Sequence, residues 1–297
     1  MKKTIYPLIS FVFSCVILLA GAGVARADDP PGWLQEAART ATPTYEIKDV
    51  PAVVLRNEES VSVDSDGKVT RTRRFAIRIL TREGRREAIA SVVYNTDGEK
   101  VKDIDAWLIR RAGQNKSYGK KEMIDVALQR NDLYNEGRIR LIDASDDTSE
   151  GDVFGYQTIS EERTVFSQFQ FLFQTDMPVL YSRISLDLPN GWSAQGITFN
   201  TATKVEPSVN GSSYVWELRD LSPIPPEAGS PSRSSLAPRL AVSFFPTGSS
   251  ASQIRTFSNW ADVARWMAEL EDPQMTVDDA LAAKAHELAD GAKTEFE

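Results

Sequence analysis

Apolar and polar residues alternate with a period of two over much of this chain of 297 residues. In residues 74–79, Phe75, Ile77 and Ile79 would share one face of a strand, while two arginines and an alanine would share the other. Successive side chains of a strand point to opposite faces, so this alternation predicts half-buried β-strands. The pattern recurs as far as residue 245 and indicates a mainly β protein.

Turn sequences divide this region into a long series of strands. Asp-Ser-Asp-Gly at 64–67 and Asp-Gly-Glu at 97–99 each predict a hairpin, and two Asn-Gly pairs predict further tight turns. The polar stretch 113–137 interrupts the series and predicts a long excursion with one helical turn near 123–128. The expected strands cover residues 52–63, the return strand through 79, 91–95, 101–111, 138–143, 153–165, 179–188, 196–200, 204–209, 214–221 and 240–245.

Both ends of this region change character. Residues 30–43 are bounded by prolines and predict a short helix with Trp33 as its anchor. The last forty residues change to a helical period, which predicts one helix after Ser258-Asn259 that ends before Asp272-Pro273. A second helix is predicted to begin at a capping box over residues 276–279.

The first 27 residues have the pattern of a secretory signal peptide. Lys2 and Lys3 precede an uncharged run over 4–25, and Ala25-Arg26-Ala27 provides small residues for a peptidase. We expect cleavage after Ala27 and export to the bacterial periplasm or cell surface. The run is also long enough to serve as an uncleaved membrane anchor. Lipidation at Cys15 is a further alternative.

Composition excludes several classes of function. Cleavage would leave no cysteine and only His286, which excludes Cys–His and Ser–His nucleophilic catalysis and a Cys/His zinc site. It would also move the formal net charge from −8 to −11, because Lys2, Lys3 and Arg26 are lost. An acidic chain is poorly suited to binding nucleic acid. We expect no metal, no cofactor and no catalytic residue.

Two patterns allow both a structural and a functional interpretation. Phe169, Phe171 and Phe173 share one face of a strand and predict an aromatic core, with a stacking platform for a sugar or base as the alternative. The acidic residues of 143–152 predict a solvated turn. A calcium loop is the alternative there, although its closing position is Gln157 rather than a glutamate.

A set of short landmarks resembles an exported bacterial family, domain of unknown function 3857. The most specific is the pair Trp260 and Trp266 in one helix, and the resemblance extends over most of residues 30–297. The other landmarks are Pro31-Gly-Trp33, the strand that begins at Ala52, Glu150-Gly-Asp-Val153, Pro189-Asn-Gly-Trp192, Tyr214-Val-Trp216 and a Pro-rich stretch before Leu240. The resemblance implies a large antiparallel β-sandwich with a short C-terminal pair of helices. It also implies a transglutaminase-like, papain-related catalytic domain further along a longer chain.

These observations define an expected domain organisation. The chain ends at Glu297, before the Cys, His and Asp of such a catalytic domain, so we expect a fragment rather than a protein that has lost the enzyme. The segments are a signal peptide (1–27), an N-terminal segment (28–45), the β-sandwich (46–257) with a Pro/Ser-rich connection (222–239), and a helical linker (258–297).

The sequence supports three functional hypotheses. The first is a non-catalytic exported accessory module, in which Trp260 and Trp266 dock the linker helix onto the sheet or the missing domain. The second is a freestanding carbohydrate- or peptide-binding protein with Trp107, Tyr181 and Trp192 as ligand contacts. The third is a metal-independent hydrolase, which would need two carboxylates facing each other across a cleft.

Overall fold

The computed structural model describes residues 29–45, 50–129, 136–163, 167–225, 227–247, 257, 259–292 and 294. The expected signal peptide lies outside these residues and stays a prediction. Among the residues described, no helix is long and apolar enough to cross a membrane.

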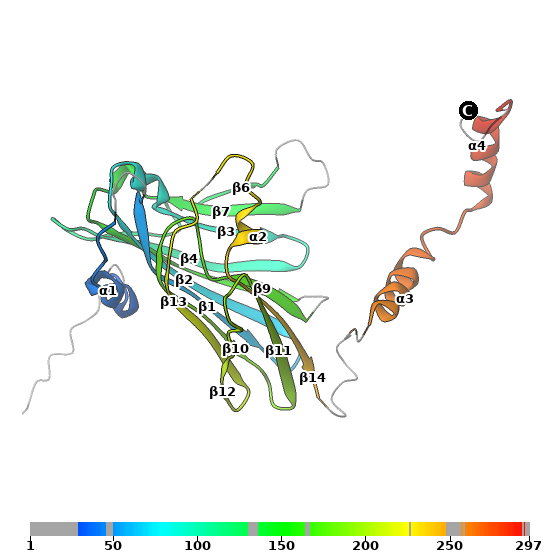
Figure 1. The fold of residues 1–297 in the computed structure, drawn as a ribbon. Coiled ribbons are helices and arrows are strands. Elements are labelled where there is room, and N and C mark those ends of the chain that lie inside the picture. The colour runs from blue at the N-terminus through cyan, green and yellow to red at the C-terminus, as the bar shows by residue number, and fades with distance from the viewer. Residues whose placement is uncertain are drawn as a thin grey trace, which may run out of the picture.

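Three β-sheets form the body of the molecule (Figure 1). The large sheet has eight strands in the order β12 (Ser208–Asn210), β13 (Ser213–Leu221), β10 (Val179–Asp187), β1 (Ala52–Val63), β2 (Lys68–Ile79), β8 (Val153–Arg163), β4 (Glu99–Ile109) and β5 (Lys116–Tyr118). One three-stranded sheet contains β11 (Trp192–Phe199), β14 (Arg239–Pro246) and β9 (Gln168–Leu172). The other contains β3 (Ile89–Asn95), β7 (Gly137–Asp143) and β6 (Ile124–Ala127). All strand pairs are antiparallel except β1 with β10, which is parallel.

Both small sheets pack on the same face of the large sheet, which we call the inner face. Phe75 and Ile77 of β2 pack there against Ala90 and Ile142 from the β3–β7–β6 sheet. Val69, on the same face of β2, packs in a second cluster with the aromatic residues of β9 and β14. The inner face therefore supports two apolar cores, one under each small sheet, and the mainly β sandwich predicted from the sequence is confirmed.

A polar band separates these two cores on the inner face. Arg71 donates hydrogen bonds to Glu59 at 3.0 Å and to Glu162 at 2.7 Å, and its guanidinium lies over the ring of Phe169. Asn57, which is almost fully buried, donates to Ser182 Oγ at 3.1 Å and so links β1 to β10. Buried polar groups need such partners, and here they are supplied across neighbouring strands.

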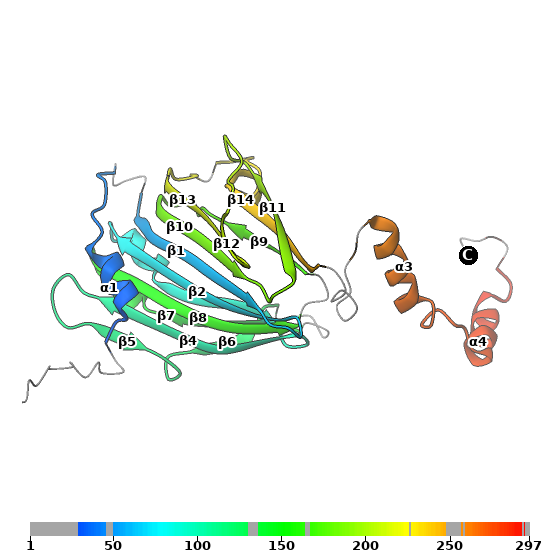
Figure 2. The same ribbon diagram turned by 90° about the horizontal axis from the view of Figure 1, so that it is seen from below.

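Helix α1 (Gly32–Arg39) covers part of the opposite face of the large sheet, the outer face (Figure 2). Its fully buried Leu34 packs against Val53, Leu55 and Ala76. Arg78 of β2 donates to the carbonyl oxygens of Ala38 and Thr40 at 2.6 and 2.9 Å, which satisfies groups that a helix C-terminus leaves unbonded. Trp33, the expected anchor, is only half-buried, because the inward stripe of the helix runs through Leu34 and Ala37.

Several local predictions are confirmed. Strand β1 has the bounds that the sequence predicted, and Phe169, Phe171 and Phe173 are buried core residues. The Pro/Ser-rich connection contains a short helix that the sequence did not predict, α2 (Arg233–Leu236). Residues 83–87 and 145–147 form single 3-10 turns.

Two predictions about the strands were wrong. Strands β3 and β4 do not form a hairpin, because β3 pairs with β7 in a small sheet whereas β4 pairs with β8 and β5 in the large one. The helical turn expected near 123–128 is the edge strand β6, whose alternating Ile124 and Val126 were too few to reveal a period of two.

Two helices, α3 (Trp260–Glu271) and α4 (Asp279–Ala289), stand apart from the sheets in both views (Figures 1 and 2). Asn259 caps α3 by accepting from the backbone N–H of Asp262, as an N-cap residue does. The cap of α4 is Asp278, whose carboxylate accepts from Leu281 N, rather than Thr276 as predicted.

Candidate functional site

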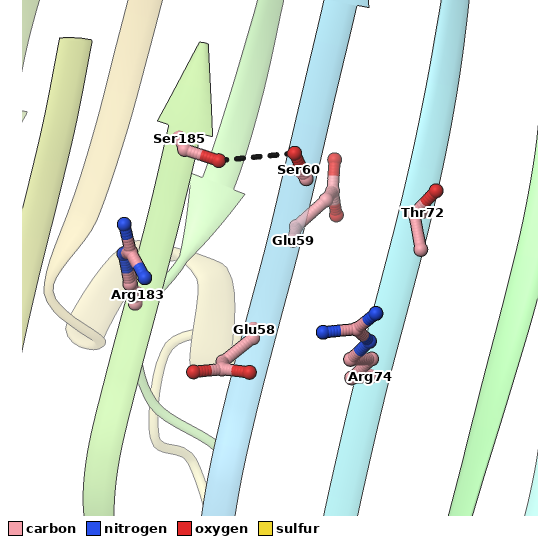
Figure 3. A pocket seen from close by; sticks show the side chains of 7 residues that line it. All are labelled: Glu58, Glu59, Ser60, Thr72, Arg74, Arg183 and Ser185. Atoms are coloured by element: carbon pink, nitrogen blue, oxygen red, sulfur yellow. Dashed lines mark hydrogen bonds between the residues drawn. The ribbon is translucent and has the colours of Figure 1, made fainter. Parts of the chain in front are cut away.

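A polar groove lies on the outer face of the large sheet, where α1 no longer covers it. Its floor comes from the central strands β10, β1 and β2, whose pairing places Arg183, Glu58 and Arg74 in one row across the sheet. The next outer-face row consists of Ser185, Ser60 and Thr72. Figure 3 shows these side chains lying side by side, with Ser185 donating to Ser60 at 3.1 Å. A row of charges thus adjoins a row of hydroxyls, along a cavity of about 270 Å³.

A second cavity of about 600 Å³ continues this groove toward α1. The two cavities share Glu58 and Arg183 among their lining residues. The walls of this larger cavity include Glu36 of α1, the segment after that helix, Tyr181 of β10 and Arg219 of β13. Together the cavities fall within the volume range of small-molecule and peptide sites.

Ion pairs and ring contacts organise the wall of the groove. Arg56 pairs with Glu36 at 3.4 Å and with Glu58 at 3.6 Å. The guanidinium carbons of Arg56 and Arg219 lie 5.9 and 4.3 Å from the ring centre of Tyr181, so both arginines make cation–π contacts with it. Tyr181 donates its hydroxyl to Glu217 at 3.1 Å, and burial followed by this carboxylate raises the pKa of Tyr181.

Arg183 differs from these residues because its charge has no partner. It makes no hydrogen bond or ion pair with the described residues, and its Nε atom is buried without an acceptor. It also lines both cavities, as does Glu58, so a guanidinium and a carboxylate both lie where the cavities meet. The neighbouring Arg74 also has no ion pair among the described residues: it donates to the Gln157 side-chain oxygen at 2.8 Å, and its guanidinium carbon lies 5.9 Å from the ring centre of Trp33.

A third cavity, of about 880 Å³, lies at the end of the large sheet where β1 and β10 begin. Its apolar wall combines the buried Met177 with four prolines, and its rim carries charges of both signs. The prolines are Pro51, Pro178, Pro223 and Pro225. Its side chains do not form a cluster suited to acid–base chemistry.

The three ligand-contact candidates lie in separate places. Trp107 makes an edge contact with Trp33 at 6.4 Å beside α1. Trp192 stacks on Phe244 at 6.2 Å, under a small sheet. Tyr181 alone borders a cavity, and two arginines already contact its ring.

The two docking candidates share helix α3. Trp260 is 86% exposed, and Met267 and Leu270 in the same stripe are also exposed. Trp266 is half-buried and lies 5.4 Å from the ring of Phe257. One face of α3 is therefore apolar and open to solvent.

Two carboxylates in the acidic stretch 143–152 already accept hydrogen bonds from other protein groups. Asp147 accepts from Lys116 at 2.6 Å and from Tyr118 at 3.0 Å, and Asp152 accepts from the backbone of Arg111 and Ser149. No three His, Cys, Asp or Glu side chains in the described ranges gather as a metal site would require. This arrangement favours the solvated turn over the calcium loop.

Two pairs of neighbouring carboxylates bear on the hydrolase hypothesis. Glu99 and Glu162 face each other on the adjacent strands β4 and β8, and the pKa of Glu99 is raised, first by burial. Asp103 and Asp105 lie two residues apart on β4, and the pKa of Asp105 is raised, first by burial and then by the charge of Asp103. The first pair lies on adjacent strands of one sheet and the second along one strand, rather than across a cleft. Neither arrangement therefore matches the pair that glycoside hydrolysis uses.

Sequence comparison identifies the family. The profile of a domain of unknown function with a solved structure, DUF3857, matches residues 65–225. The chain belongs to this family. None of the curated proteins matches it.

A solved structure shares the fold at low identity. A proposed protease from Parabacteroides distasonis superposes with a TM-score of 0.63 at 14% identity, over 83% of this chain and 48% of that one. The chain thus spans about half of that protein. Yeast LTA4 hydrolase, in complex with bestatin, gives a TM-score of 0.33 at 11% identity, over 72% of this chain and 33% of that one. An M1 zinc metallopeptidase from Deinococcus radiodurans gives 0.28 at 9% identity, over 74% and 53%. The last two similarities are too weak to support any inference.

Proposed function

We propose that this chain is a non-catalytic, exported accessory module, which positions a transglutaminase-like domain that follows it in a longer protein. The observation that carries the proposal is the open apolar face of α3. Trp260, Met267 and Leu270 lie along one stripe of this helix and are exposed to solvent. A large aromatic side chain that is left exposed favours a binding surface, because burying it against a partner is strongly favourable.

Two further observations support an accessory role. The superposition with this chain covers only 48% of the Parabacteroides distasonis protein, so in that protein the shared fold is accompanied by a comparable length of other sequence. In addition, the β3–β7–β6 sheet exposes the aliphatic side chains of Val93, Ile124 and Val126 on the side that faces solvent. Contiguous apolar surface of this kind often marks a contact with another domain.

The export part of the proposal rests on the N-terminal pattern. Two lysines, an apolar run and Ala25-Arg26-Ala27 are the parts that signal peptidase substrates share. Secretion of the mature chain with Asp28 as its first residue, read by N-terminal sequencing, is the expected outcome.

Replacement of both tryptophans, Trp260→Ala with Trp266→Ala, tests the docking role. In this chain alone the melting temperature of the β-sandwich is expected to stay unchanged, because α3 stands apart from the sheets. In a version extended through the following domain, losing a central aromatic anchor should remove about 2 kcal/mol or more and lower the melting temperature by several degrees. Arg265→Ala, on the polar side of α3, is the matched control. If the double variant melts like the parent in both versions, the helix does not dock the domain.

A further inference from the structure

The floor of the outer-face groove has the arrangement of a site for a negatively charged ligand. Across the sheet, Arg74 and Arg183 flank the carboxylate of Glu58. That carboxylate already has a cation, since Arg56 lies 3.6 Å from it. Glu59 also lines the smaller cavity, and Arg71 pairs with its carboxylate at 3.0 Å. Arg183 has no ion-pair partner among the described residues, and it lies half-buried at the junction of the two cavities.

We propose that this groove binds an extended acidic peptide, with a carboxylate of the peptide held by Arg183 and Arg74. A guanidinium presents a rigid fork of N–H donors that matches a carboxylate, and such charge-assisted hydrogen bonds are stronger than neutral ones. The inference is independent of the docking role of α3, because it concerns a different surface.

The spacing of the floor favours a peptide. On β10 the outward residues are Arg183 and Ser185, and on β1 they are Glu58 and Ser60, two positions apart in each strand. An extended peptide lying along the strands repeats its side chains at the same interval. One carboxylate of the peptide can therefore meet the row of arginines while a polar group two residues further along meets the row of hydroxyls.

Other ligand classes fit the groove less well. Sugars are bound by stacking on an open aromatic face, but Arg56 and Arg219 both contact the ring of Tyr181. Nucleic acid needs a broad basic surface, whereas the whole chain has a net charge of −8.

A β-bulge lies at the edge of the site. The register between β1 and β2 shifts between Val54 and Arg56, at the point where outward residues change from apolar to charged. Bulges often occur beside functional sites, where they redirect a side chain. Here the shift coincides with the position of Arg56, which holds Glu58 and contacts Tyr181.

Fluorescence anisotropy of labelled hexaglutamate against the full chain tests the proposal. Saturable binding that weakens with added salt is expected, together with no saturable binding of labelled hexaglutamine. Arg183→Met should weaken binding about tenfold or more, since it removes a charge-assisted contact. Arg183→Lys should give an intermediate loss, because it keeps the charge but not the fork.

Arg265→Met on α3 is the matched control, because it removes the same charge far from the groove. Circular dichroism melts identify any variant that fails to fold, and Arg74→Met provides a second, exposed position at which to measure the loss. The proposal is overturned if wild type does not bind hexaglutamate, if Arg183→Met binds as tightly as Arg265→Met, or if hexaglutamine binds equally well. Preferential binding of an oligogalacturonate would assign the groove to an acidic glycan and would also overturn it.

Discussion

The outer face of the large sheet has two halves built from the same strands: helix α1 covers one half, and the other half is open. Under α1, the outward residues of β1 are Val53 and Leu55, and Leu34 buries against them. Beyond the helix, the outward residues of the same strand are Glu58 and Ser60, and they line an open groove. One strand face thus changes from apolar to polar where its covering helix ends.

On the inner face, by contrast, β1 is apolar near both of its ends. Val54 near the start of β1 and Val61 near its end are both fully buried, one in each apolar core. Whether the outward residues of β1 are apolar or polar therefore depends on whether α1 covers them, and not on the strand itself. A face left polar in the middle of a wide sheet indicates solvent or a ligand.

Leu34→Ala gives the largest expected effect, because it removes the side chain that defines the covered half. Leu34 is 0% exposed, and truncation of such a buried leucine destabilises a protein by about 2–5 kcal/mol. Denaturant unfolding would measure the change. Leu288→Ala on α4, where the side chain is 75% exposed, should change stability by less than about 0.5 kcal/mol. Equal effects of the two substitutions would show that α1 does not stabilise the sheet.

Gly155→Ala tests how closely α1 approaches the sheet and has the next largest effect. A Cβ atom at Gly155 would lie 2.9 Å from Leu34 Cδ2, nearer still to Cδ1, and 3.1 Å from the backbone oxygen of Phe75. Overpacking of this kind costs about 1–3 kcal/mol.

Gly32→Ala is the control for this substitution, because a Cβ atom there meets no atom within 4 Å. In a helix, alanine is favoured over glycine, so this variant should be neutral or slightly more stable. A Gly155→Ala variant as stable as the Gly32→Ala variant would contradict the close packing of α1 on β8.

The alternation of apolar and polar residues in the sequence predicted the strands of the covered half well. The alternation in β2 gave the right strand and faces, because burial on one side leaves a period of two in the sequence, and the bounds predicted for β1 were also right. It failed for β6, which is short, and for the pairing of β3, because nothing local distinguishes a hairpin from a crossover to another sheet.

The open half could not be predicted in the same way. The polar outward pairs of β1, β2 and β10 are each visible in the sequence, but their alignment in two rows depends on the parallel pairing of β1 with β10. Ser60 and Ser185 meet across 125 positions of sequence. Of the ligand contacts expected from aromatic content, only Tyr181 borders the groove, whereas Arg183 carried no distinguishing local feature.

The smallest expected effect is a change in the pKa of Tyr181 when its neighbours in and beside the groove are replaced. Burial and then the Glu217 carboxylate raise the pKa of Tyr181 above its ordinary value of about 10, while the charge of Arg183 lowers it. Arg183→Met should therefore raise this pKa further, and Glu217→Gln should lower it. Ultraviolet difference absorbance, with Tyr181→Phe to identify the contribution, would measure both changes.

The same group links the groove to stability at high pH. Because the folded-state pKa of Tyr181 is raised, its contribution to stability is fully present below pH 10 and is lost as the pH rises through the folded-state value. Glu217→Gln should reduce that alkaline loss, whereas Leu34→Ala should leave its pH dependence unchanged, since the covered half is held by apolar contacts. If Arg183→Met left the titration of Tyr181 unaltered, the two side chains would not share one groove.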